Sequence, residues 1–266
     1  MFSFSSKLLM LAMGRQHITR KCFSSSYCIN IYLNIVNNWP PPFSSDMTKY
    51  NERDFDPIVR RSCKTKRVSL KIAKAIVIGD VSVGKSCLVN RFCHKIFDNN
   101  YKATIGVDFE VERFDILGVP FHLQMCVHFA NLLFVYLFQM GYFLCYKYCI
   151  LVIMVVFDLA NLISLGHCQQ WLNEAAQSNT EPYYIFLIGT KRDLLSNQVY
   201  TIMEKRAAEV ARRMKAEFWA VSARTGDGVS ELFTRATVLS FHAMILHELQ
   251  NMKPESINIG SDLIST

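Results

Sequence analysis

The sequence lacks the cysteine patterns that indicate a metal site or a disulfide framework. It has nine cysteines, but none of them form a CxxC pair, so no CxxC is followed by the HxxxH spacing of a zinc site. Cys87 and Cys93 fall within one expected helix, too far apart along it to form a disulfide. The missing spacing argues against a zinc site, and we interpret the cysteines as reduced, buried or incidental thiols of a cytosolic protein.

Acidic residues are also missing from the first 45 positions. Residues 1–70 hold 11 Lys and Arg against 4 Asp and Glu, whereas residues 71–266 hold 18 of each. The net charge of +7 therefore belongs to an N-terminal extension, and the rest of the chain is balanced. A nucleic-acid-binding domain carries its basic residues across its own surface, so we expect no nucleic-acid partner.

The N-terminal extension allows several interpretations. Residues 1–45 resemble a mitochondrial transit peptide in composition, whereas the apolar run in KLLMLAMG is short for a secretory signal. A disordered leader, or upstream sequence absent from the mature protein, explains the same composition. NWPPPFSS predicts a linker. VRRSCKTKR, from Val59 to Arg67, is expected to be a solvated approach to a domain, with a nuclear signal or an anionic-lipid patch as alternatives.

Charge is almost absent from residues 123–161. Lys147 is the only Lys or Arg of this stretch, and Asp158 is its first acidic residue. At a rise of about 1.5 Å per residue, a helix over Phe129–Tyr146 would nearly span the hydrocarbon core of a bilayer. A membrane crossing is therefore one interpretation of this run, to be weighed against the motifs on either side of it.

The first of these motifs is a phosphate-binding loop. Ala73–Ile78 is a short β-branched run typical of a buried parallel strand, Gly79–Ser86 reads GxxxxGKS, and a helical pattern follows. Backbone N–H groups at such a helix N-terminus converge on phosphate oxygens. Lys85 supplies a charge between the β- and γ-phosphates, and the Ser86 hydroxyl is a Mg²⁺ ligand. The residues expected to bind phosphate are Ser82, Val83, Gly84, Lys85, Ser86 and Cys87.

Two further motifs indicate guanine. YIFLIGTKRDLL is a strand followed by a turn, in which the Asp193 carboxylate accepts from guanine N1–H and N2–H₂, two donors that adenine does not offer in that geometry. EFWAVSARTG is a strand from Glu217 to Val221 followed by Ser222, Ala223 and Arg224, where the Ala223 N–H meets guanine O6. All three motifs lie at the carboxyl ends of strands, where α/β sheets bind ligands. The residues expected to bind the base are Thr190, Lys191, Asp193, Ser222, Ala223 and Arg224.

These segments resemble the Rab small GTPases, and most closely the branch numbered thirty-four and thirty-six. The resemblance rests on GDVSVGKSCLVNRFC, FDNNYKATIGVDFEVERFDILGVPFHLQ, IFLIGTKRDL and MKAEFWAVSARTG. It implies GTP and GDP as ligands with Mg²⁺, and Thr104 as the switch I residue that reaches Mg²⁺ and the γ-phosphate. It also implies exchange factors, activating proteins and trafficking effectors as partners, and a cytoplasmic protein peripheral to Golgi or endosomal membranes.

The chain departs from the family pattern between Cys126 and Cys149. The family has W-D-T-A-G-Q-E and a helix there, with an aspartate for the Mg²⁺ water, a glycine that senses the γ-phosphate and a glutamine that orients the attacking water. The W-D-T-A-G-Q-E motif that supplies these three residues is absent, so we name no catalytic residue. The other D-x-x-G, Asp115–Gly118, falls in an expected hairpin and is not a substitute. Val81 crowds the γ-phosphate, and Arg224 replaces the usual lysine of the third motif.

The replaced segment does not fit a membrane anchor. A single crossing would separate the phosphate loop from the guanine motifs and destroy the site that the remaining sequence specifies. The residues of the segment are those that pyrimidine-rich codons encode, so our hypothesis is that Cys126–Cys149 is translated intron or a mispredicted exon. The last cysteine is Cys168, so the sequence as given lacks the prenylated C-terminus of the family and its stable membrane attachment.

The predicted fold is α/β, a three-layer P-loop GTPase domain with a mostly parallel six-stranded sheet and helices on both faces. We expect residues 1–67 to be a disordered extension, 68–250 the GTPase domain with an aberrant insert at 126–149, and 251–266 a tail. Further expectations are an antiparallel hairpin of Phe109–Ile116 with Phe121–Met125, a helix opened by a capping box at Thr201, a helix packing Trp171 on the sheet, and a last helix over Val229–Leu249 with Leu232, Phe233, Val238 and Phe241 in the core.

The function indicated is a GTP-dependent switch in vesicle and membrane trafficking, hence a GTP hydrolase by resemblance. Two alternatives remain open at this point. One is a nucleotide-binding protein that recruits partners without efficient hydrolysis, because the D-T-A-G-Q residues are absent. The other is a single-pass membrane protein with a decayed domain.

Overall fold

A computed structural model of the chain describes residues 50–65, 71–98, 107–128, 150–177 and 183–251. The elements in chain order are η1 (Glu52–Asp54), α3 (Pro57–Lys64), β1 (Lys71–Ile78), α4 (Lys85–His94), β2 (Val107–Ile116), β3 (Val119–His128), β4 (Ile150–Asp158), α6 (Leu162–Gln177), β5 (Tyr184–Thr190), η2 (Arg192–Leu194), α7 (Asn197–Met214), β6 (Glu217–Ala220) and α8 (Val229–Asn251).

The six strands form one sheet in the order β2-β3-β1-β4-β5-β6. Only β2 is antiparallel to its neighbour, and the other pairings are parallel. This confirms the predicted mostly parallel six-stranded sheet. The strand order reverses at β1, which pairs with β3 on one side and β4 on the other, and ligands of open α/β sheets bind at the carboxyl ends of the strands beside such a point.

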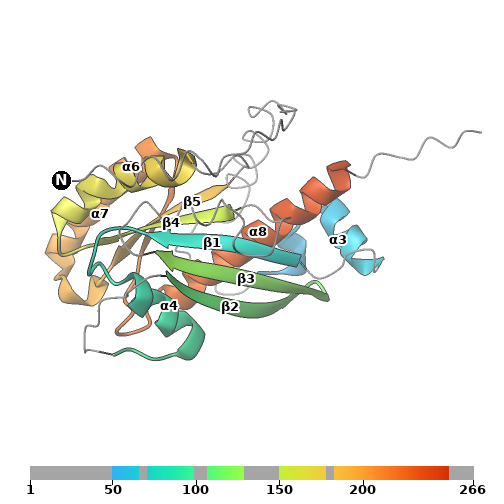
Figure 1. Cartoon of the computed structure of the whole chain (residues 1–266), viewed down its shortest axis with the longest axis horizontal. Coiled ribbons are helices and arrows are strands. Elements are labelled where there is room, and N and C mark those ends of the chain that lie inside the picture. Colours follow the sequence, from blue (N-terminus) through green and yellow to red (C-terminus); the bar gives the residue numbers. More distant parts are fainter. Residues whose placement is uncertain (1–49, 66–70, 99–106, 129–149, 178–182, 252–266) are drawn as a thin grey trace, which may run out of the picture.

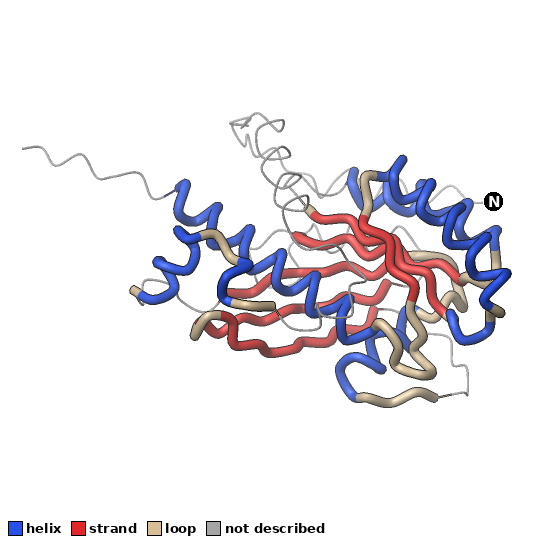
Figure 2. The backbone as a smooth tube through the Cα atoms, turned by 180° about the vertical axis from the view of Figure 1, so that it is seen from behind, coloured by secondary structure: helices blue, strands red, loops and turns tan. Residues whose placement is uncertain are grey.

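Helices cover both faces of the sheet (Figures 1 and 2). Helices α4, α8 and α3 pack in the hydrophobic cluster of one face, and α6 and α7 pack in the cluster of the other. Strand β1 supplies both clusters because its side chains alternate: Ala73, Ala75 and Val77 face α4 and α8, whereas Ile76 and Ile78 face α6 and α7. The three-layer architecture is therefore confirmed.

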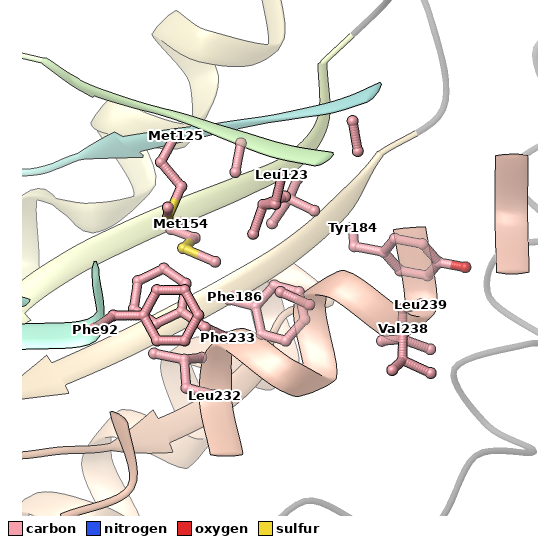
Figure 3. Packing of buried hydrophobic residues seen from close by; sticks show 14 of the residues in the cluster. Phe92, Leu123, Met125, Met154, Tyr184, Phe186, Leu232, Phe233, Val238 and Leu239 are labelled. Carbon is pink, nitrogen blue, oxygen red and sulfur yellow. The ribbon is translucent and has the colours of Figure 1, made fainter. Parts of the chain in front are cut away.

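Helix α8 forms the core of its face. Its predicted core residues are all buried, and Phe233 stacks on Phe92 of α4 with ring centroids 4.3 Å apart (Figure 3). This contact fixes the helix of the phosphate loop against α8. The predicted core residues in α8 are Leu232, Phe233, Val238 and Phe241.

The hairpin is also confirmed, with longer strands than predicted. Leu117 and Gly118 both have positive φ, the conformation of a tight two-residue hairpin turn, and the Gly118 N–H donates to Asp115 Oδ1 at 3.0 Å. Strand β3 continues three residues beyond Met125. Cys126 and Val127 pair with β1, so the departure from the family pattern begins inside the sheet.

The start of α7 differs from the prediction. The helix begins at Asn197 after Ser196, which has the extended backbone of an N-cap residue, so the capping box at Thr201 was wrong. Thr201 lies inside the helix, and its hydroxyl donates to the Asn197 carbonyl at 2.9 Å. Glu204 instead accepts from the Tyr200 hydroxyl at 3.0 Å. The Thr-x-x-Glu pattern arose within the helix and did not mark its beginning.

Residues 50–65 form an N-terminal strap on α8. Asp56 caps α3 by accepting from the Ile58 N–H at 2.8 Å. The apolar side chains of the strap, Phe55, Val59 and Cys63, are buried in the cluster that contains α8. The strap therefore differs from the expected disordered or solvated extension. Within the charged run, Val59 and Cys63 lie four residues apart, so both pack on one side of a helix.

Two hydrogen bonds hold the strap at the end of the sheet opposite the phosphate loop. The Tyr50 hydroxyl donates to the Asp115 carbonyl at 2.9 Å, and the Asp56 N–H donates to His242 Nε2 at 3.3 Å. Figure 1 shows α3 beside the C-terminal part of α8, far from α4. Residues 1–49 lie outside the described part of the chain.

Candidate guanine nucleotide site

The phosphate loop joins β1 to α4 and depends on two glycines. Gly79 has φ of +141°, and a Cβ there would lie 2.0 Å from the Val156 carbonyl oxygen. Gly84, with φ of +97°, is the N-cap residue of α4. Side chains are excluded at Gly79 by the approach of β4 and disfavoured at Gly84 by its backbone conformation. Together they let the chain turn from the strand into a helix whose first N–H groups face the loop.

Lys85 is held over this loop by main-chain oxygens. Its Nζ donates to the carbonyls of Gly79 at 2.8 Å and Asp80 at 2.6 Å. Burial lowers the pKa of Lys85 to about 8, and the Asp80 carboxylate opposes this shift in part. The amine is therefore positioned and mostly charged at neutral pH, which suits it to bind phosphate oxygens.

The residues after β5 brace the same loop from the other side. Thr190 Oγ1 lies within hydrogen-bond distance of the carbonyl oxygens of Val83 and Phe157. Lys191 Nζ donates to the Ser82 carbonyl at 3.0 Å and forms an ion pair with Asp158 Oδ2 at 2.7 Å. The second predicted motif is thus in direct contact with the first.

Asp193 is held by the third motif. The Ser222 hydroxyl donates to Asp193 Oδ1 at 2.6 Å, and Arg224 Nη1 lies 3.9 Å from Asp193 Oδ2. Ser222 also closes its own loop, because its hydroxyl accepts from the Thr225 N–H at 3.2 Å and its carbonyl from the Gly226 N–H at 2.8 Å. These contacts hold the Asp193 carboxylate in a defined orientation against the Ser222–Arg224 loop.

All the predicted site residues but one lie together at the carboxyl end of the sheet. The exception is Thr104, which lies outside the described residues, as does most of the replaced segment, 129–149. Mg²⁺ is commonly bound through one or two protein ligands plus phosphate oxygens and water. Ser86, in the first turn of α4, fits the role of such a protein ligand. The described residues contain no cluster of three or more His, Cys, Asp or Glu side chains that could hold a metal.

Sequence reasoning missed a contact between α6 and the phosphate loop. Trp171 Nε1 donates to Asp80 Oδ1 at 2.7 Å, and His167 Nδ1 lies 2.7 Å from Asp80 Oδ2. Trp171 was expected only to pack, and it does contact the core beneath α6. The spacing of four between His167 and Trp171 was the available signal, because it places both side chains on one helix face.

The sequence profile of the Ras family matches residues 74–240. The chain belongs to the Ras family. Ras-related protein Rab-34 of Homo sapiens is 44% identical over 220 residues, covering 81% of this chain and 83% of that protein. Rab-34 of Sus scrofa is 46% identical over 230 residues (85% and 86%), and Rab-36 of Homo sapiens is 37% identical over 235 residues (86% of each).

Family membership confirms several predictions. The chain is a Rab-like small GTPase of vesicle trafficking, a class of GTP hydrolases that bind GTP and GDP with Mg²⁺ and act through regulators and effectors. Membership of this class does not favour the alternatives of a non-hydrolysing recruiter or of a membrane-spanning protein, and the efficiency of hydrolysis in this chain stays a prediction. Within the described residues, no helix has both the length and the apolar character that crossing a bilayer requires.

Proposed function

We propose that this chain is a guanine nucleotide switch whose site is formed by three motifs acting together. The phosphates bind to the loop from Ser82 to Cys87, the base binds to Asp193 and the Ala223 N–H, and Ser86 with Thr104 holds Mg²⁺. The observation that carries the proposal is the Ser222–Asp193 hydrogen bond of 2.6 Å, which orients a carboxylate at the base position. The Lys191–Ser82 contact joins this base site to the phosphate loop. The remaining base-site residues are Thr190 and Arg224.

Asp193→Asn tests the assignment of the base. The amide cannot accept from both guanine donors, so we expect GDP to bind on the order of a hundredfold more weakly in a fluorescence titration. The same amide can donate to the extra carbonyl of xanthine, so xanthosine diphosphate should bind the variant better than it binds the wild type. Unchanged GDP affinity would show that TKRD does not bind the base.

We also propose that the chain binds GTP better than it hydrolyses it. The family carries an aspartate just after the tryptophan that follows β3, whereas Cys126, Val127 and His128 continue β3 here, and Val127 is buried. Val81, within the phosphate loop, is 48% exposed, and its branched side chain crowds an attacking water. Single-turnover hydrolysis of bound GTP measures this directly, and a rate typical of family members that retain the switch II glutamine would contradict it.

For location, we propose a cytoplasmic protein peripheral to Golgi or endosomal membranes, with residues 68–250 as the GTPase domain and the strap packed against it. The similarity to Rab-34 and Rab-36 supports this, because it extends over most of the chain. Imaging the full-length chain against Golgi, endosomal and mitochondrial markers tests it, and mitochondrial labelling would favour the transit-peptide interpretation of residues 1–45.

A further inference from the structure

Arg91 connects the helix of the phosphate loop to the loop of the third motif. It lies in the last turn of α4, which begins at Lys85. Its Nη1 donates to the Lys95 carbonyl at 3.1 Å, and its Nη2 donates to the Thr225 carbonyl at 3.0 Å. Thr225 directly follows Ser222–Arg224. One guanidinium therefore binds both the end of the phosphate helix and the loop that contacts the base.

The loop is shaped to receive this side chain. Gly226 has φ of +90°, and a Cβ at this position would lie 2.9 Å from Arg91 Nη2 and 3.1 Å from Nε. The guanidinium thus lies against the α-carbon of Gly226. Arginine suits the position because its planar fork donates to two acceptors in fixed directions, which a single ammonium does not.

The contact reaches the base-binding groups through a chain of hydrogen bonds. The N–H groups of Thr225 and Gly226 both donate to Ser222, and Ser222 donates to Asp193. The Ala223 N–H, which is assigned to guanine O6, lies inside this closed turn. A shift of the turn away from α4 would move that N–H relative to phosphates bound at the other end of the same helix.

We propose that Arg91 is a positioning residue for the guanine base, holding the Ser222–Asp227 turn at a fixed distance from the phosphates through α4. The inference rests on the proposed function and deepens it. Arg91 does not touch the nucleotide. Arg91 sets where the O6 contact is made. The affinity lost when Arg91 is removed therefore depends on whether the nucleotide makes that contact.

The test compares two nucleotides in the wild type and three variants. GDP carries O6, whereas 6-thioguanosine diphosphate keeps the N1–H and N2–H₂ donors but replaces O6 with sulfur, a weaker acceptor. We expect Arg91→Ala to raise the Kd for GDP about tenfold but that for the thio analogue less than about threefold. Arg91→Lys should recover part of the loss, and it gives the same comparison if the alanine variant does not fold. Arg212→Ala, in the exposed last turn of α7, is the matched control.

If the role of Arg91 were merely structural, its loss would weaken the binding of both nucleotides by the same factor. Equal losses for GDP and the thio analogue, or no loss for GDP, would overturn the assignment of Arg91 while leaving the proposed function intact. Failure of the wild-type chain to bind GDP would overturn both.

Discussion

Lys85 is the residue on which we expect phosphate binding to depend most, and its protonation state is set by its surroundings. The amine is buried and donates to two carbonyl oxygens, which hold it where a phosphate would bind. Its pKa falls to about 8 because burial disfavours the charged form more than the Asp80 carboxylate favours it. In the ligand-free protein Lys85 therefore loses its positive charge at a pH that is experimentally accessible.

We expect nucleotide affinity to fall as the pH rises past this value. Phosphate binds the charged amine, so above pH 8 the protein must take up a proton to bind, and the Kd for GDP should rise about fourfold between pH 7 and pH 8.5. Titration with a fluorescent GDP analogue at several pH values measures it. In Asp80→Asn the carboxylate that raises the pKa of Lys85 is absent, so the Kd for GDP should begin to rise at a lower pH. A flat profile in both proteins would contradict the prediction.

At the scale of elements, β3 and the segment after it decide how the switch responds to nucleotide. Strand β3 runs to His128 and offers no carboxylate in its last three positions. An activating protein accelerates hydrolysis by about 10³–10⁵-fold around an oriented water, and the residue that orients this water in the family is absent here. The six-stranded sheet is complete, so we expect nucleotide binding and hydrolysis to be separable in this chain.

Replacing Cys126–Cys149 by a family-type segment that begins W-D-T-A-G-Q-E should restore both hydrolysis and nucleotide sensing. The chain as given should show little stimulation by an activating protein and similar effector binding with GDP and GTP. In the chain that carries the family-type segment, the activating protein should raise the hydrolysis rate by about 10³–10⁵-fold. Single-turnover assays with and without activator compare the two. Strong stimulation of the original chain would mean that another residue positions the water.

The elements were predictable where local chemistry decides them, and less so where distant contacts do. The phosphate loop between β1 and α4 was evident because GxxxxGKS needs a strand before it and a helix after it. The start of α7 was misplaced because Thr201 and Ser196 are both accepted cap residues, and the Thr-x-x-Glu spacing favoured Thr201. Arg91 could not be found, since no local pattern shows that Thr225 folds back onto α4. The strap was missed because its apolar residues are sparse among charges.

For the whole molecule, the strap adds stability at a distance from the site. Phe55 is buried against Phe241 and His242, so Phe55→Ala should lower the free energy of unfolding by about 3 kcal/mol. GDP affinity should not change, because the strap lies at the other end of the sheet. Urea unfolding and GDP titration measure the two effects. Ile58→Ala, at a neighbouring exposed position, is the control and should stay within about 0.5 kcal/mol of the wild type.

The strap also determines how a mechanical load enters the molecule. Residues 1–49 are joined to the folded unit at Tyr50, whose hydroxyl is bonded to the β2–β3 hairpin. Tension on that upstream segment would detach the strap sequentially from this point, first Tyr50, then Phe55, then Val59. The force would fall on the hairpin and α8 before it reached β1 and the phosphate loop. A tether attached upstream would therefore load the nucleotide pocket only after the strap has detached.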